Sequence, residues 1–188
     1  KMTEEINFIL DSAKEAMVDS VAHLEKEFLN IRAGKASPQM LGGVFVDYYG
    51  SQTPLSQIAN INAADARTLT VTPWEKNMLH PIEKAIMIAN LGLNPMNNGD
   101  NIIINIPALT EERRRDLVKQ AKSEAEDAKI GIRNHRKDAN TDIKKEEKDG
   151  TAEDICKKAE EDVQKLTDSF IRKVDEILVV KEAEIMKV

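Results

Sequence analysis

Nine consecutive residues, KIGIRNHRK, carry four cationic side chains and no carboxylate, although the formal net charge of the chain is -6. Two of the cations, Arg133 and Arg136, are arginines, whose planar guanidinium can form two parallel hydrogen bonds to one phosphate. Together with Lys129 they are spaced by four and three residues, which places them on one side of a helix. The segment therefore has the chemistry of an anion-binding site.

The same side of this expected helix carries further polar residues, and we call the whole set the basic ridge. At about 100° per residue, its members fall within roughly 60° of one another: Arg115, Lys122, Lys129, Arg133, Arg136 and Asn140. Five of the eight arginines lie in the segment 107–150, whereas each of the other segments has more acids than bases. A cationic line of this length suits a polyphosphate, RNA above all. Because Glu126 interrupts it, a solvated face with ion pairs four residues apart stays open as the alternative.

Catalytic and metal-binding patterns are not found in the sequence. The three histidines, His23, His80 and His135, fall in different expected elements, and His135 lies at the edge of an apolar stripe. Phosphate-binding loops, nucleophile elbows and zinc-binding spacings do not occur. We therefore expect no enzyme activity, no metal and no cofactor. With the single Cys156 and no long apolar run, we expect a reduced, cytoplasmic monomer that does not enter membranes.

Apolar residues at spacings of three and four predict three long helices. The first spans about residues 3–30, with Thr3 as its N-cap. The second follows Pro107, with Thr110 as its N-cap, and ends near Gly150. Thr151 and Asp154 are expected to begin the third. Helices of roughly 40, 55 and 50 Å, of which the last two must be antiparallel neighbours, indicate a three-helix bundle.

Residues 33–106 have a different pattern. The stretches GGVFVDYYGSQTPL, RTLTVTPW and NNGDNIIINIP combine apolar alternation with turn residues and predict strands. HPIEKAIMIANLGLNP predicts a short helix. The fold class is therefore α+β, with a bundle domain of residues 1–32 and 107–188 and a small β/α domain, 33–106, inserted between its first two helices.

The chain passes between these two domains twice. Gly34, Pro38 and Pro107 prevent a continuous helix through either linker. We take Ala33, Gly34, Ile106 and Pro107 as a double-linker hinge that permits a limited swivel. A rigid elbow is the alternative that the sequence leaves open.

Six segments together resemble the bacterial ribosome recycling factor family, in the family's order and over essentially the whole chain: IRAGKASPQML, VDYYGSQTPL, EKAIMIANLGLNP, LTEERRRDL, IRNHRKDAN and DVQKLTD. The resemblance implies a three-helix bundle and a smaller domain, similar in outline to a transfer RNA. It also implies binding to the large ribosomal subunit after termination. With elongation factor G and its GTP hydrolysis, subunit splitting and release of mRNA and transfer RNA would follow, without catalysis by the factor itself.

Residue by residue, the resemblance implies that Arg133, Arg136 and Arg32 face large-subunit ribosomal RNA, and that Lys122 and Lys129 stand where basic residues are common. The sequence departs from the family at Ala33, Lys35 and His135; Lys35 keeps the charge of an arginine but not its fork. Two further classes stay open. One is a general RNA-binding helical bundle without splitting activity, and the other is a coiled-coil adaptor, which would need a second exposed apolar stripe.

Overall fold

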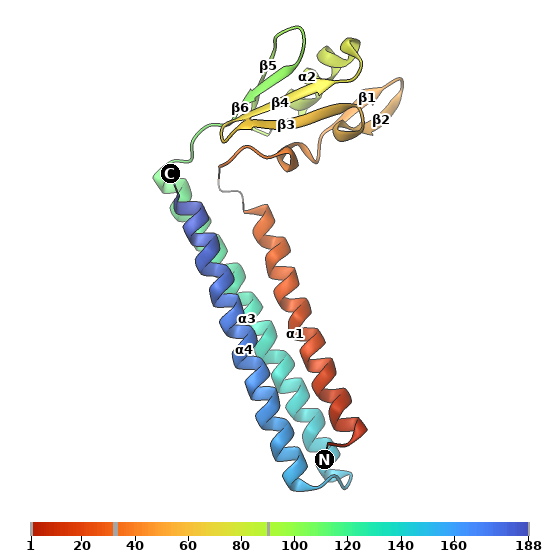
Figure 1. Ribbon diagram of the computed structural model, residues 1–188, viewed down its shortest axis with the longest axis vertical. Helices are drawn as coiled ribbons and strands as arrows, with labels where there is room; N and C mark the ends of the chain where they lie inside the picture. Colours follow the sequence, from red (N-terminus) through yellow and green to blue (C-terminus); the bar gives the residue numbers. More distant parts are fainter. Residues whose placement is uncertain (1, 32–33, 90, 188) are drawn as a thin grey trace. The chain divides into compact units, whose positions relative to one another are not determined.

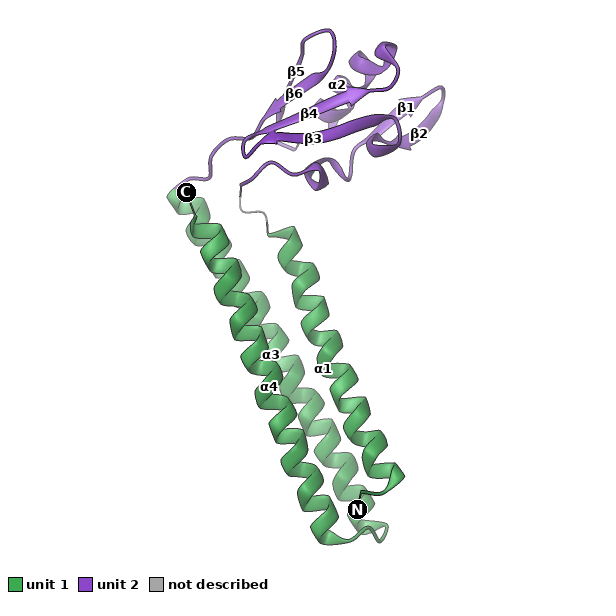
Figure 2. Ribbon diagram, viewed as in Figure 1, with its two compact units in different colours: residues 1–33, 111–188 green, residues 34–110 purple. Residues whose placement is uncertain are grey.

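The structure is a computed structural model that describes residues 2–31, 34–89 and 91–187. It divides the chain into two compact units, residues 1–33 with 111–188 and residues 34–110 (Figure 2). The α+β fold class is confirmed, because long helices make up the first unit and small antiparallel sheets form the second (Figure 1). Residues 107–110 group with the second unit in the structure, whereas the sequence analysis placed them with the bundle.

Unit 1 consists of three long helices that lie side by side, α1 (Glu4–Asn30), α3 (Glu111–Lys148) and α4 (Glu153–Met186) (Figure 1). The predicted first cap is confirmed: the Thr3 hydroxyl accepts a hydrogen bond of 3.2 Å from the amide of Ile6. Gly150, with φ of 113°, follows the end of α3 as expected, since glycine reaches this conformation without a Cβ penalty.

The beginning of α4 differs from the sequence expectation. Its N-cap is Ala152, which provides no side-chain hydrogen bond, so the prediction that Thr151 caps this helix was wrong. The amide of Thr151 instead donates to the carbonyl of Glu146 and closes the end of α3. Because the connection is short, Thr151 belongs to the hydrogen-bonded turn that ends α3. It lies one residue before the N-cap position of α4.

The core of unit 1 follows the predicted stripes with a small rotation on α4. The buried residues of α1 and α3, which include Met17, Leu24 and Ile132, recur at spacings of three, four and seven, as the predicted stripes require. On α4, Cys156 and Thr167 are buried although neither was predicted to be. The Thr167 hydroxyl donates 2.8 Å to the carbonyl of Val163, so its polar group is satisfied inside the helix.

In its described residues, unit 2 contains six strands and one α-helix. Hairpin β1 (Phe45–Tyr48) and β2 (Ser51–Pro54) stands apart from a four-stranded antiparallel sheet in the order β3-β4-β6-β5. The sheet's strands are β3 (Ala59–Asp65), β4 (Thr68–Pro73), β5 (Asn94–Asn97) and β6 (Ile102–Asn105). The helix is α2 (Leu79–Ile88), and three 3₁₀ turns cover Pro38–Leu41, Leu55–Gln57 and Lys76–Met78.

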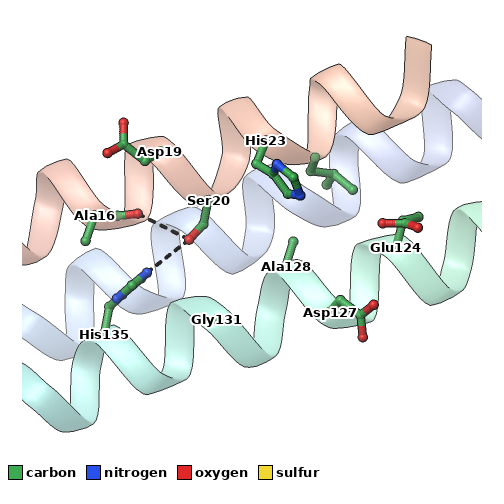
Figure 3. A pocket seen from close by; sticks show the side chains of 10 residues that line it. Ala16, Asp19, Ser20, His23, Glu124, Asp127, Ala128, Gly131 and His135 are labelled. Atoms are coloured by element: carbon green, nitrogen blue, oxygen red, sulfur yellow. Dashed lines mark hydrogen bonds between the residues drawn. The ribbon is translucent and has the colours of Figure 1, made fainter. Parts of the chain in front are cut away.

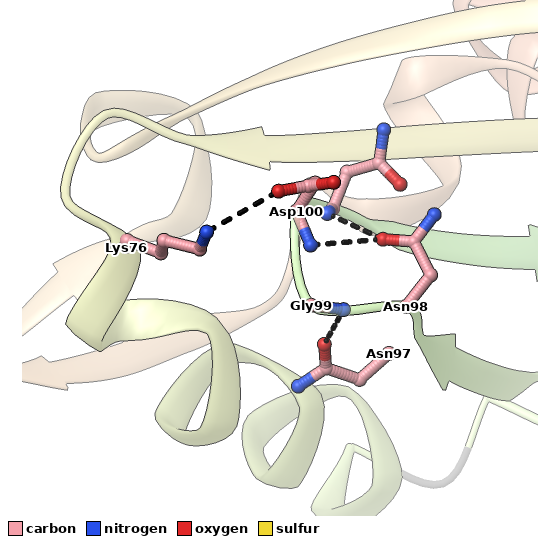
Figure 4. A network of polar contacts seen from close by, with 6 residues as sticks. Lys76, Asn97, Asn98, Gly99 and Asp100 are labelled. Carbon is pink, nitrogen blue, oxygen red and sulfur yellow. Dashed lines mark hydrogen bonds and ion pairs between the residues drawn. The ribbon is translucent and has the colours of Figure 1, made fainter.

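The core of unit 2 lies on one face of the four-stranded sheet. Leu69 pairs with Ile104 and Val71 with Ile102 in the β4–β6 register, and all four side chains are buried. The predicted turn at Gly99 joins β5 to β6, where side-chain oxygens of Asn97 and Asn98 accept backbone amides (Figure 4). Lys76 reaches the same turn through an exposed ion pair with Asp100.

Candidate nucleic-acid interface

Helix α3 positions every member of the basic ridge, because residues separated by three, four or seven positions return to the same side of a helix. The resemblance added Arg32, which lies outside the residues that the structure describes. The six ridge residues of α3 do not have equal freedom, and they fall into two groups according to their contacts.

Two of the ridge cations are held against α4. Lys129 forms an ion pair with Asp175, and only 18% of its side chain is exposed. Arg136 Nη1 donates 3.3 Å to Oε1 of Gln164, whose amide nitrogen in turn donates to Asp168 at 2.9 Å. The α4 side chains therefore hold these two cations along the seam between the helices.

The other cations project into solvent. Arg115 Nη2 contacts Glu111 Oε1 at 2.7 Å one turn away, in an exposed pair. Arg133 Nη1 lies 3.7 Å from Glu126 Oε1, and 42% of its side chain is exposed. Lys122 is exposed and has no ion pair within the described part of the chain. Exposed pairs of this kind contribute only about 0.3 to 0.5 kcal/mol each, so an incoming polyanion can replace their carboxylates at little cost.

Two polar atoms of the ridge have no hydrogen bond. Arg136 Nε and Asn140 Oδ1 are enclosed and unpartnered among the described residues, and the two residues are one helical turn apart. Buried polar atoms are usually satisfied in folded proteins, so each such atom needs a reason. A small rotation that exposed them would present a donor and an acceptor beside the cations of the ridge.

Sequence reasoning missed the α4 residues that support the ridge. Gln164, Asp168 and Asp175 read as ordinary polar positions, yet they contact Arg136 and Lys129 directly or through one another. Their spacing of four and seven residues was the available signal, because it puts all three on one side of α4. To predict that this side of α4 faces α3, the rotation of α4 about its own axis must be known. The apolar pattern alone defines that rotation only to within one residue.

The predicted hinge residues have different environments. Ile106 is buried in unit 2, and its amide donates 2.7 Å to the carbonyl of Arg67 in the β3–β4 turn. In the other linker, the amide of Ala36 donates 2.8 Å to the carbonyl of Ala66 in the same turn. Pro107 is exposed and lies in no regular element. Ala33 lies outside the described residues.

Gly34 is tightly constrained. Its φ is +77°, a region that residues with a Cβ rarely adopt, and an added Cβ would lie 2.6 Å from Cγ of Leu109. The two linkers therefore touch each other at Gly34 and Leu109 within unit 2. Glycine is required at this position both by backbone conformation and by space.

Among the remaining titratable groups, Cys156 lies in the core of unit 1 and His135 at its edge. Among the residues described, no three His, Cys, Asp or Glu side chains are arranged to hold a metal ion. Burial raises the pKa of the Cys156 thiol, and neighbouring acids such as Glu147 raise it further, so the thiolate is disfavoured. His135 packs at the edge of the core as expected, with Nε2 3.1 Å from the Ser20 hydroxyl (Figure 3). No described helix is long and apolar enough to cross a bilayer.

The fold and the ridge define a helical-bundle protein with an inserted β/α unit and a cationic face on its longest helix. The sequence profile described as ribosome recycling factor matches residues 24–186. The chain is 79% identical to the ribosome-recycling factor of Flavobacterium psychrophilum and 76% identical to that of Flavobacterium johnsoniae, in both cases over 100% of the two chains. The chain belongs to the ribosome recycling factor family.

Solved structures agree with this assignment. A solution structure of a ribosome recycling factor, 36% identical, superposes with a TM-score of 0.75 and full coverage of both chains. A second chain, 43% identical, gives a TM-score of 0.60 with 97% of this chain and 99% of the other covered. It comes from models of the Thermus thermophilus factor and Escherichia coli elongation factor G bound to the E. coli post-termination complex.

Proposed function

We propose that this protein binds the large ribosomal subunit of the post-termination complex in the cytoplasm. With elongation factor G and GTP, it then promotes splitting of the ribosome into subunits and release of mRNA and transfer RNA. It acts as a monomer and catalyses no reaction, because the energy comes from GTP hydrolysis by the elongation factor. One observation carries most weight: the match to this family extends over the whole chain at up to 79% identity among the relatives compared.

The RNA-binding surface in this proposal is the basic ridge together with Arg32. Arg133 is the best placed of the arginines, because its ion pair with Glu126 is long, at 3.7 Å, and 42% of its side chain is exposed. Arg136 is adjacent and presents its guanidinium from the α3–α4 seam. Lys129 contributes its positive charge at short range, because its ammonium group is already paired with the carboxylate of Asp175. Replacing condensed counterions on ribosomal RNA would supply much of the affinity.

Unit 2 contacts elongation factor G in this proposal, and the two linkers allow it to move. Its charges are nearly balanced, with four bases and five acids in residues 33–106, so it offers RNA little counterion release. Because Ala36 and Ile106 are tied to the β3–β4 turn, both residues would move together with unit 2.

A subunit-splitting assay tests this proposal. Post-termination ribosomes are mixed with the protein, elongation factor G and GTP, and subunit separation is followed by light scattering and sucrose-gradient sedimentation. The proposal predicts splitting only when all three are present. Saturable binding to purified large subunits without any splitting would instead favour the general RNA-binding bundle.

A further inference from the structure

The opposite side of α3 from the ridge bears a continuous groove along its seam with α1. Three adjoining hollows, of about 470, 180 and 610 Å³, form it. The first and second share Ala16 and His135, and the second and third share Phe8, Ile9 and Asp142. The groove lies wholly within unit 1. From Glu124 to Lys148, the last residue of α3, it follows 24 helical steps, or roughly 36 Å, which is the span of about eleven residues of extended polypeptide.

Small side chains leave this seam hollow. Ala16 and Ser20 on α1 face Ala128 and Gly131 on α3 in the first hollow (Figure 3). The α3–α4 seam, in contrast, is covered by long side chains such as Lys129. The bottom of the groove is apolar where Leu24 lines it, and farther along Ile9 and Phe8 form its wall. Phe8 is 73% exposed, which leaves a large apolar surface open to solvent.

The rims of the groove are strongly acidic. Nine carboxylates line the three hollows: Glu4, Glu5, Asp19, Glu124, Asp127, Asp138, Asp142, Glu146 and Asp149. Within the described residues none of them is in an ion pair, and the lysine and arginine side chains described along the groove are limited to Lys145. The imidazoles of His23 and His135 also line the first hollow. The ridge differs, because three of its cations have a carboxylate beside them: Arg115, Lys129 and Arg133.

We propose that this groove is a docking site for a lysine- and arginine-rich polypeptide segment that also carries apolar side chains. Charge complementarity selects the occupant: cationic side chains would pair with the unpaired rim carboxylates, and apolar side chains would cover Phe8, Ile9 and Leu24. RNA is excluded because its phosphates would face nine carboxylates. A small polycation would satisfy the charge but would leave the apolar wall exposed to water.

The site is independent of the proposed RNA-binding ridge, because the two lie on different seams of α3. Both could be occupied at once, so a basic arm of a protein that itself lies on RNA could hold the bundle from the side opposite to the ridge. It follows that changes in the groove should weaken binding of a basic peptide and leave affinity for RNA-containing particles unchanged.

The test uses the intact protein and two synthetic peptides of twelve residues. The leucine peptide consists of lysine, arginine and three leucines. The alanine peptide has the same charge, with alanine in place of each leucine. Binding is measured by calorimetry, and the site is mapped by amide chemical shifts in ¹⁵N spectra. We expect saturable binding of the leucine peptide, with the largest shifts at Ser20, Leu24 and Gly131. The alanine peptide should bind at least fivefold more weakly.

Two variants make the result specific. Asp19→Asn with Glu124→Gln and Asp127→Asn should lower affinity at least tenfold. A matched control removes three exposed α4 carboxylates that have no ion pair in the described part of the chain: Glu153→Gln, Glu161→Gln and Glu176→Gln. It changes the net charge equally and should lower affinity less than twofold. The uncharged change Phe8→Ala should weaken the leucine peptide and leave the alanine peptide unaffected.

Three outcomes would overturn the proposal. These are absence of saturable binding by the leucine peptide, equal weakening by the two triple variants, and displacement of the leucine peptide by spermine at comparable concentration. The second would show only general attraction to an acidic protein, and the third would identify a site for small polycations.

Discussion

The cations of α3 are alike in the sequence but differ in what surrounds them. Lys129 and Arg136 are held by α4 side chains, whereas Lys122 is free of ion pairs within the described residues. A role in binding and a role in stability can therefore be separated experimentally. Arg133 is the arginine at which the two roles diverge most, because its ion pair with Glu126 is exposed and exposed ion pairs stabilise the fold so little.

Replacing Arg133→Ala together with Arg136→Ala should reduce affinity for large ribosomal subunits and leave the melting temperature nearly unchanged. Each lost phosphate contact should also flatten the dependence of log affinity on log salt concentration by about one unit. Equilibrium binding at several salt concentrations measures both effects.

The matched control for this pair is Arg172→Ala with Lys173→Ala, since both side chains are exposed on α4 and the charge change is the same. It should keep most of the affinity. Full affinity in the Arg133 and Arg136 double variant at moderate salt would rule out the ridge as the RNA-binding surface.

The hydrogen bond between His135 and Ser20 should stabilise the bundle through a specific pair. The Ser20 hydroxyl donates 3.2 Å to the carbonyl of Ala16, so it accepts from Nε2–H of His135. Ser20→Ala alone leaves the imidazole nitrogen unpartnered and should cost about 1 kcal/mol. In a His135→Leu background the same change should cost much less. A double-mutant cycle tests this: urea unfolding is measured for the wild type, the two single variants and the double variant. Equal costs in both backgrounds would mean that the pair does not interact.

At the scale of the elements, the linkers are more constrained than their sequence suggests. Ala36 and Ile106 are fastened to neighbouring carbonyls of one turn, and Gly34 packs on Leu109. If unit 2 moves as proposed, these contacts would keep the two linker segments attached to it during the movement.

Gly34→Ala should destabilise unit 2 by more than the 1 to 2 kcal/mol or so that a left-handed conformation costs a residue with a Cβ. The excess comes from the approach to Leu109, so it should shrink when Leu109→Ala is introduced as well. Gly43→Ala is the control, because nothing lies within 4 Å of a Cβ there and its φ is not positive. Denaturant unfolding gives the energies. If Gly34→Ala proved as harmless as Gly43→Ala, the linkers would not be constrained at this point.

Gly34→Val should further impair splitting while binding to large subunits survives, since the bundle core lies elsewhere. Splitting with elongation factor G and GTP is compared with equilibrium binding of the same variant. Equal loss in both assays would indicate a misfolded elbow, and full activity in both would show that Gly34 has no part in the movement.

Unit 2 also has a pH-dependent contact. The Tyr48 hydroxyl donates 2.5 Å to Glu75, and this bond, with partial burial and the carboxylate's charge, raises the pKa of Tyr48 above 10.0. A raised folded-state pKa contributes stability that is present below pH 10 and is lost as pH rises through the folded value. Wild-type stability should therefore fall above about pH 10 more steeply than that of Tyr48→Phe, as measured by urea unfolding. Parallel pH profiles would contradict this assignment.

The sequence predicted the long helices better than the sheet. Period and caps located α1 and α3 within a residue or two, because many turns repeat the same signal. Strands β4 and β6 were found from alternating Leu69, Val71, Ile102 and Ile104. Strands β3 and β5 were missed, because alanine and asparagine dominate β3 and Pro95 lies in β5. Both are edge strands, which depend on a neighbour more than on their own propensity.

The candidate site was predicted only in part. The face of α3 followed from spacing, since helical geometry fixes which residues share a side. The partners of Lys129 and Arg136 on α4 could not be predicted from spacing, because a contact between two helices depends on their mutual rotation. The burial of Thr167 and Cys156 shows that α4 is rotated from the orientation that its apolar pattern indicates. The groove between α1 and α3 was likewise absent from the prediction, since it results from which small residues face each other.

For the whole molecule, charge is divided between regions. Unit 1 holds a ridge of cations on one seam of α3 and a groove of carboxylates on another, and unit 2 is nearly balanced. We infer that the bundle binds ribosomal RNA and that unit 2 contacts elongation factor G. This division predicts that the bundle binds large subunits without unit 2 but does not split ribosomes.

A bundle without unit 2 separates these two roles. In this shortened chain, residues 34–110 are replaced by about twelve residues of glycine and serine, which span roughly 20 Å and rejoin α1 to α3. Circular dichroism first establishes that the bundle is helical and folds cooperatively. The decisive measurement is then salt-dependent binding to purified large subunits, with splitting assayed in parallel. We predict binding that competes with the intact protein, and no splitting. A folded bundle without affinity for large subunits, or one that splits ribosomes unaided, would contradict this division of roles.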